Sequence, residues 1–143
     1  MNKIVLISGG FDPIHSGHIA LINNASKYGD VVVLLNSDKW LRNKKGKEFL
    51  PYKERKIIMF SVKNVIDVIK FNDEDMTCIN GIQKALKKYS HHKIFFANGG
   101  DRNKNSTPEK IFCEKNNIKN LWGVGGHKKT NSSSWILKKW RTP

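Results

Sequence analysis

The chain alternates short apolar runs with segments of helical periodicity, and this alternation limits the folds open to it. The apolar runs indicate buried strands, and the spacing of apolar residues after each run favours a helix. Strands are expected at 3–8, 31–35, 65–69, 94–97 and 121–124. Helices are expected at 17–28, 51–63, 78–89 and 108–117, with a last helix beginning near 132–134. Five β-then-α units predict an α/β fold, with residues 1–143 forming a single Rossmann-like, doubly wound domain around a five-stranded parallel sheet.

Glycine pairs follow three of the expected strands, at Gly9-Gly10, Gly99-Gly100 and Gly125-Gly126. In parallel sheets, ligands bind at the carboxyl ends of the strands, so these pairs indicate one ligand-binding edge. Residues 38–50 are rich in lysine and irregular, and we expect a loop there. Whether residues 39–47 close over a substrate as a lid stays open.

Composition is that of a single globular domain. The 143 residues are 38% hydrophobic and 27% charged, and Cys78 and Cys113 show no metal-ligand spacing. We therefore expect no protein-held metal site. Without a signal-peptide pattern or a run of about 20 apolar residues, we expect a cytoplasmic protein with no membrane partner.

The net charge of +14 is unusual and attracts polyanions. It fits either a nucleic-acid surface or a cleft that attracts a small polyanion such as a nucleoside triphosphate. The lysines are spread along the whole chain with few aromatic residues among them, which argues against a nucleic-acid groove.

The first strand-to-helix junction, residues 9–18, combines three features of a phosphate site. Glycines let backbone amides approach an anion, and a helix begins directly afterwards, with unpaired N–H groups that favour phosphate. His15 and His18 flank Gly17, so both imidazoles can face one crevice and donate hydrogen bonds to phosphate oxygens. The two histidines could instead be loop and helix-cap residues, but their spacing after a glycine-ended strand favours a functional role.

Residues 10–18, Gly-Phe-Asp-Pro-Ile-His-Ser-Gly-His, resemble the G-x-F-D-x-x-H-x-G-H signature of the cytidylyltransferase-like nucleotidyltransferases. That family includes glycerol-3-phosphate and phosphocholine cytidylyltransferases and heptose-1-phosphate adenylyltransferase. Further similar segments are Asn36-Ser37-Asp38, Lys44-Lys45-Gly46, Glu54-Arg55, Gly99-Gly100-Asp101 and Asn131-Ser132-Ser133-Ser134.

The resemblance implies a donor site for the nucleoside triphosphate. His15 and His18 would bind the triphosphate and stabilise the transition state at the α-phosphorus, and Mg²⁺ would accompany the triphosphate as cofactor. Other residues that the resemblance assigns to the nucleotide are Gly10, Phe11, Asp12, Gly17, Gly100, Asp101, Ser132, Ser133 and Ser134.

The resemblance also implies an acceptor site. Lys44 would be catalytic, and Asp38, Lys45 and Arg55 would bind the substrate, with Lys44 or Lys45 on a phosphate group. The lysines could also be a solvated loop, and Arg55 could simply form a helical ion pair. A homodimer is a further implication of the family.

The resemblance implies transfer of a nucleoside monophosphate, CMP before AMP, to a small phosphorylated or phosphonate acceptor with release of pyrophosphate. His127-Lys128-Lys129-Thr130 carries no arginine where cytidylyltransferases have one, and Arg102 follows Asp101 in place of tryptophan. These departures leave a sugar-phosphate adenylyltransferase open. A non-catalytic nucleotide- or nucleic-acid-binding module is the other alternative, which the charge supports and the intact His15 and His18 oppose.

Overall fold

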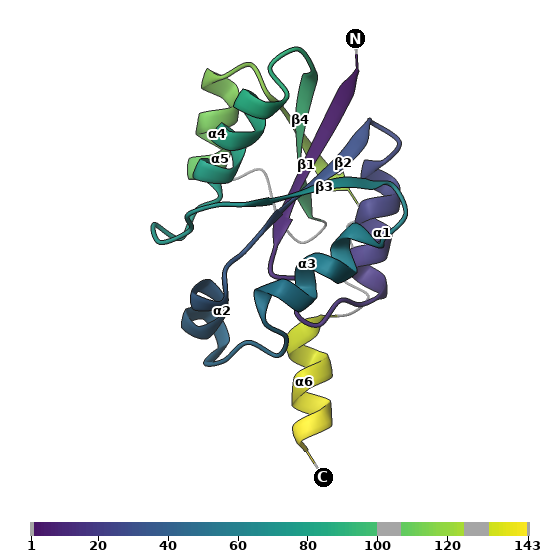
Figure 1. The fold of residues 1–143 in the computed structure, drawn as a ribbon, viewed down its shortest axis with the longest axis vertical. Coiled ribbons are helices and arrows are strands. Elements are labelled where there is room, and N and C mark those ends of the chain that lie inside the picture. Colours follow the sequence, from purple (N-terminus) through teal and green to yellow (C-terminus); the bar gives the residue numbers. More distant parts are fainter. Residues whose placement is uncertain (1, 100–106, 125–131, 143) are drawn as a thin grey trace.

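The computed structural model describes residues 2–99, 107–124 and 132–142, and Figure 1 shows how they are arranged. Five strands and six helices follow one another along these residues. The strands are β1 (Lys3–Gly9), β2 (Asp30–Leu35), β3 (Val65–Lys70), β4 (Lys93–Gly99) and β5 (Lys119–Val124). The helices are α1 (Ser16–Ala25), α2 (Asp38–Lys45), α3 (Tyr52–Phe60), α4 (Ile79–Lys88), α5 (Pro108–Lys115) and α6 (Ser133–Arg141).

The strands form one parallel sheet in the order β3-β2-β1-β4-β5. Residues 4–9 of β1 pair with residues 30–35 of β2, and residues 3–6 of β1 pair with residues 93–96 of β4. The strand order therefore reverses at β1, which places the switch point of the doubly wound fold beyond the ends of β1 and β4. The predicted Rossmann-like fold is confirmed.

Helices cover both faces of the sheet because alternate residues of a buried strand point to opposite sides. Val5 of β1 belongs to the core under α1 and α3, together with Ile22. Leu6 belongs to the core under α4 and α5, together with Ile82 and Cys113. Figure 1 shows these helix pairs on opposite sides of the sheet, with α2 and α6 beyond the end at which β1 finishes.

One expected element is wrong: the segment 38–50 is not all loop, because residues 38–45 form α2. Ser37 caps this helix by accepting a hydrogen bond from the Trp40 amide at 3.0 Å, and Gly46 ends it with φ of 91°. Leu41 is the only residue of α2 that is buried. A helix that buries one side chain has almost no apolar periodicity, which is why the spacing did not indicate it. The helix expected at 51–63 also ends earlier, at Phe60.

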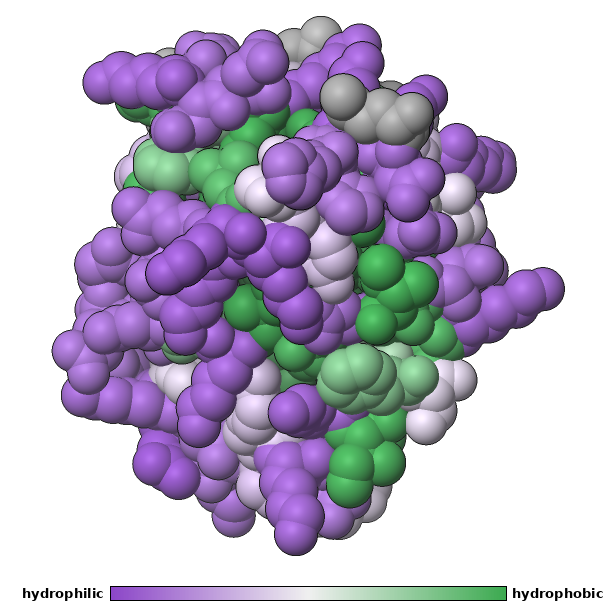
Figure 2. All heavy atoms as spheres, turned by 45° about the horizontal axis from the view of Figure 1, so that its top comes forward, coloured by the Kyte–Doolittle hydropathy of each residue, from purple (hydrophilic) through white to green (hydrophobic). Residues whose placement is uncertain are grey.

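The surface is strongly polar. Hydrophilic side chains cover most of the face seen in Figure 2, with apolar groups in smaller areas between them. Within the described parts of the chain, no helix has the length and apolar character needed to cross a membrane.

Candidate nucleotide-binding site

Two histidines cap the N-terminus of α1. Nδ1 of His15 accepts a hydrogen bond from the Gly17 amide at 3.0 Å, and Nδ1 of His18 accepts one from the His15 amide at 3.2 Å. Together these bonds form a reciprocal capping box. A nitrogen that accepts is not protonated, so each neutral imidazole carries its proton on Nε2. Nε2 is then the nitrogen that can donate to a phosphate oxygen, and capping and anion binding use different atoms of the same ring.

The two rings are held together as one unit. Their centroids lie 3.8 Å apart with an interplanar angle of 28°, and the ring of Phe11 meets His18 edge-on at 4.7 Å. Burial, then the neighbouring His15 and then Lys45 lower the pKa of His18 from 6.5 to about 3. His18 is therefore neutral near pH 7, so its Nε2–H can serve as a hydrogen-bond donor while the ring carries no charge.

Asp12 organises the loop in front of the histidines. Its side chain is fully buried, and its carboxylate accepts hydrogen bonds from the amides of Phe49 at 2.6 Å and Leu50 at 2.7 Å. Nζ of Lys45 lies 3.6 Å from Oδ2 of Asp12 and also donates to the backbone carbonyl of Asp12. The carboxylate thus fixes residues 49–50 and Lys45 around the histidine loop.

Arg55 joins the segments that surround this loop, and its side chain is fully buried. Its guanidinium donates to the carbonyls of Gly10 at 3.0 Å and Asn36 at 2.8 Å, and Nε donates to the carbonyl of Leu50 at 2.9 Å. A fourth hydrogen bond, 2.7 Å long, reaches the carboxylate of Asp38 at the start of α2. The family resemblance implied that Arg55 and Asp38 bind the substrate. In this structure the two side chains bind each other, and Arg55 also binds the protein backbone.

Asp73 is a residue of this region that the sequence reasoning missed. Its carboxylate accepts hydrogen bonds from Nδ2 of Asn36 at 3.0 Å, the amide of Ser37 at 2.8 Å and the hydroxyl of Ser37 at 2.7 Å. It therefore holds the turn between β2 and α2, at the carboxyl ends of the strands. The sequence feature that could have indicated Asp73 is its position, three residues after the end of β3.

The two neighbouring lysines of α2 lie in different surroundings. Nζ of Lys44 lies over the ring of Trp40, 4.7 Å from its centroid. Lys45 reaches the histidine loop, as its contacts with Asp12 and its effect on the pKa of His18 show. Successive helical residues differ by about 100° in direction, which is consistent with the different contacts of the two lysines.

The start of α6 lies against the same loop. Ser132 caps the helix by accepting a hydrogen bond from the Trp135 amide at 3.0 Å, and the hydroxyl of Ser133 donates to the carbonyl of Pro13 at 2.7 Å. The last helix thus brings its N-terminal amides beside α1, as the expected phosphate site requires. Gly10, at the start of the histidine loop, packs against α2. A Cβ at this position would lie 2.6 Å from Cδ2 of Leu41, so there is no room for a side chain. Gly100 and Asp101 lie outside the described residues.

The residues of the site fit a metal ion that arrives with its ligand. In the ranges 2–99, 107–124 and 132–142, no group of three or more histidine, cysteine, aspartate or glutamate side chains is placed to hold a metal. Mg²⁺ keeps several waters and is commonly bound through substrate phosphates, so a triphosphate could carry it into this site.

Comparison with known proteins decides the family. The sequence model of the cytidylyltransferase-like family matches residues 6–126. The chain belongs to this family. Cytidylyltransferase-like relatives include the bifunctional protein HldE of Blochmanniella floridana, which is 37% identical over 106 residues, or 73% of this chain. HldE of Escherichia coli O1:K1 / APEC is 31% identical over 112 residues, or 69% of this chain.

The chain spans about a quarter of the length of these relatives, 21% and 24% respectively. Among solved structures, the lipopolysaccharide core biosynthesis protein of Thermoplasma volcanium GSS1 has the same fold, with a TM-score of 0.64 and 22% identity. That likeness covers 84% of this chain and 93% of the other.

Proposed function

We propose that this cytidylyltransferase-like protein transfers a nucleoside monophosphate from a nucleoside triphosphate to a small phosphorylated or phosphonate acceptor. An oxygen of the acceptor attacks the α-phosphorus, the bond from that phosphorus to the bridging oxygen breaks, and pyrophosphate leaves. The observation that carries the proposal is the stacked pair His15 and His18 at the start of α1, whose Nδ1 atoms both accept backbone hydrogen bonds and so place each ring proton on Nε2.

Charge accumulates on the oxygens around the α-phosphorus in such a reaction, and fixed donors stabilise it. His15 and His18 supply two donors at the start of α1. Lys45, held by Asp12, adds a positive charge beside His18 and takes the role that the sequence resemblance gave to Lys44. The amides of Ser132, Ser133 and Ser134 and the hydroxyl of Ser134 would hold the leaving pyrophosphate. Mg²⁺ would enter with the triphosphate and offset its charge.

Arg55 and Asp38 position the site in this proposal and do not touch the acceptor. The guanidinium links the ends of β1 and β2 to α2 and to residue 50, so it fixes the distance between the histidine loop and Lys45.

CTP is the first candidate donor, as the family resemblance implies. ATP is the second, and two segments favour it: Gly99-Gly100-Asp101 and Glu74-Asp75-Met76-Thr77 are more similar to the heptose-type adenylyltransferases. Arg102 and the absence of an arginine at residues 127–130 are departures from the cytidylyltransferases.

Pyrophosphate release tests the proposal. The chain would be incubated with Mg²⁺, each of the four ribonucleoside triphosphates and a panel of glycerol phosphate, phosphocholine, phosphoethanolamine, sugar 1-phosphates and simple phosphonates. We expect release with one triphosphate and one acceptor, and only a small fraction of it from a His18→Ala variant. Failure of all four triphosphates to bind would contradict the proposal.

A further inference from the structure

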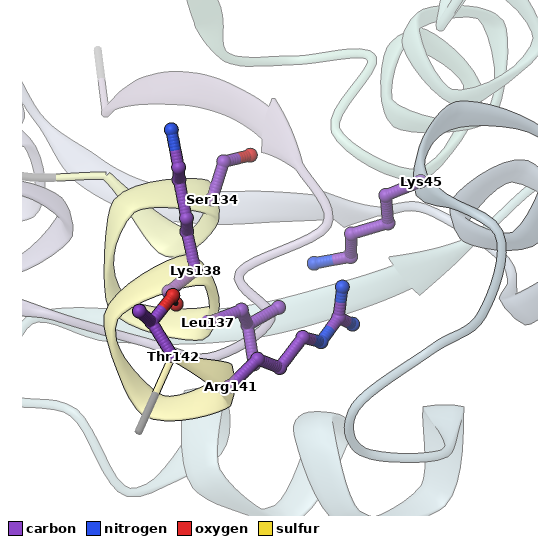
Figure 3. A pocket seen from close by; sticks show the side chains of 6 residues that line it. All are labelled: Lys45, Ser134, Leu137, Lys138, Arg141 and Thr142. Carbon is purple, nitrogen blue, oxygen red and sulfur yellow. Dashed lines mark hydrogen bonds between the residues drawn. The ribbon is translucent and has the colours of Figure 1, made fainter.

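A cavity of about 300 Å³ lies between the end of α2 and one side of α6, from Ser134 in its first turn to Arg141 at its end. Its lining residues are Lys45 of α2 and Ser134, Leu137, Lys138, Arg141 and Thr142 of the last helix and the residue after it. Figure 3 shows the side chains of Lys45 and Arg141 extending toward each other from the two helices, with Lys138 on the same side of α6 as Ser134. The volume is at the lower end of the range for small-molecule sites.

The cavity carries excess positive charge. Three of its six lining residues are cationic and none is acidic. Lys45 is paired with Asp12 across 3.6 Å, but neither Lys138 nor Arg141 forms an ion pair with any described residue. Burial lowers the pKa of Lys45, Asp12 opposes this, and the charges of Arg55 and Arg141 lower it further. An anion between Lys45 and Arg141 would relieve this repulsion.

Helix polarity alone explains some basic residues at the end of α6, since cations stabilise a helix C-terminus. Lys139 shares that explanation and is exposed, but it does not line the cavity. The C-terminal end of a helix itself repels anions, so an anion in this cavity depends on the side chains of Lys45, Lys138 and Arg141.

The cavity adjoins the proposed donor site and shares two lining residues with it. Nζ of Lys45 also donates to the carbonyl of Asp12 in the histidine loop, and Ser134 lies in the first turn of α6, which the proposed function gives to the leaving pyrophosphate. Arg141 lies eight residues beyond Ser133, about 12 Å along the helix axis at 1.5 Å per residue. The Arg141 end of the cavity is therefore separated along α6 from the amides at the start of the helix.

We propose that this cavity binds the phosphate group of the acceptor, with Arg141 and Lys45 as its direct ligands and Lys138 as a further positive charge. The assignment rests on the proposed nucleotidyl transfer, which requires a second anion next to the α-phosphate. Arg141 presents a planar fork suited to two phosphate oxygens, and Lys45 joins the acceptor to the reacting centre.

Calorimetric titration tests the proposal without requiring turnover. Glucose 1-phosphate and glycerol 3-phosphate would each be titrated into the whole chain with Mg²⁺ and a saturating α,β-methylene analogue of ATP or CTP. The Arg141→Gln variant would be compared with Lys139→Gln, which removes one exposed charge from the same helix outside the cavity. Glucose without phosphate serves as the neutral probe, and thermal melting checks that each variant is folded.

We expect at least one of the two phosphates to bind, and Arg141→Gln to raise its Kd about tenfold, the typical effect of one lost charge-assisted hydrogen bond. The Kd of the methylene analogue should stay unchanged in both variants, and Lys139→Gln should leave every Kd unchanged. Failure of both phosphates to bind the unaltered chain would overturn the assignment. Weaker binding of the analogue alone in Arg141→Gln would also overturn it, because the cavity would then serve the triphosphate.

The two proposals fail in different experiments. Phosphate binding that depends on Arg141, in a chain that releases no pyrophosphate with any acceptor, would support the anion cavity and contradict nucleotidyl transfer. Pyrophosphate release with an acceptor KM that Arg141→Gln does not change would support nucleotidyl transfer and overturn the cavity assignment.

Discussion

At the scale of single residues, His18 has two roles that a substitution can separate. Its Nδ1 caps α1, and in the proposed reaction its Nε2–H is a donor for the transition state. We expect His18→Ala to lower kcat by about 10²- to 10³-fold, the usual cost of one fixed transition-state donor. The lost cap should lower the free energy of unfolding by only about 1 kcal/mol. Steady-state kinetics and urea unfolding measure both, and near-normal turnover would remove His18 from the reaction.

The pKa of His18 also predicts how stability depends on pH. Because the pKa is lowered to about 3 in the folded chain, the unfolded chain takes up this proton near pH 6.5 while the folded chain does not. The neutral ring therefore stabilises the fold above pH 6.5, and this contribution is lost as the pH falls from 6.5 toward 3, by up to about 1.4 kcal/mol per pH unit.

Urea unfolding of the unaltered chain and of a His18→Gln variant between pH 4 and pH 7 measures this contribution. Glutamine keeps an acceptor for the His15 amide but does not titrate. We expect the free energy of unfolding of the variant to fall less steeply as the pH is lowered. The difference in slope should correspond to about one bound proton. Equal slopes would show that His18 binds its proton equally well in both states.

Lys44 and Lys45 form a natural matched pair, since they are adjacent and chemically identical. Lys45→Gln should lower kcat/KM strongly and also destabilise the chain, because it leaves the buried carboxylate of Asp12 without its cation. Lys44→Gln mainly changes an exposed side chain that lies over Trp40, a contact of about 0.5–1 kcal/mol. Steady-state kinetics and thermal melting of both variants measure which substitution has the larger effect. A larger fall in kcat/KM from Lys44→Gln would mean that Lys44, and not Lys45, acts in the reaction.

At the scale of elements, the strands were predictable because the central strands bury residues on both faces and the edge strands still carry short apolar runs. Continuous apolar runs gave all five within two residues of their observed limits at either end. The lysine-rich α2 was not predictable from periodicity, since Leu41 is the only buried residue on it, although Ser37 and Gly46 are ordinary signals for the ends of a helix. Because α2 was not predicted, the sequence could not show which of Lys44 and Lys45 lies beside the histidines.

Sequence similarity placed Arg55 in the site but could not give its partners, which come from four different segments. Those partners predict what its loss does. Arg55→Ala would leave the carbonyls of Gly10, Asn36 and Leu50 buried without donors and Asp38 without its cation. Removing one partner of a buried ion pair typically costs about 3–5 kcal/mol, so we expect a large fall in the free energy of unfolding.

Urea unfolding separates this role from direct acceptor binding. Lysine at position 55 keeps the charge but lacks the fork of donors, so Arg55→Lys should recover only part of the stability. An Arg55→Ala variant with unchanged stability and a raised acceptor KM would instead restore the substrate-binding role that the family resemblance implies.

At the scale of the whole molecule, the charge of +14 acts over a distance on any polyanion. The cations of the site and of the α6 cavity lie where parallel sheets bind ligands, beyond the carboxyl ends of the strands. Hydrophilic side chains also cover much of the surface seen in Figure 2, which is the distribution expected when part of the charge serves solubility.

This distribution predicts how salt affects the enzyme. Screening should slow capture of the triphosphate, so kcat/KM for the triphosphate should fall about tenfold between about 50 and 500 mM salt. The value of kcat at saturating triphosphate should change little, because salt screens short contacts with partly buried groups such as Lys45 much less.

A 20-base-pair duplex of arbitrary sequence provides the contrast. A nucleic-acid module that neutralises several phosphates would bind this duplex with a steep salt dependence, and the duplex would displace the triphosphate. We expect the duplex to leave pyrophosphate release unchanged at about 150 mM salt, close to physiological ionic strength. Tight duplex binding that persists at this ionic strength and blocks the triphosphate would mean that the positive surface is built for nucleic acid.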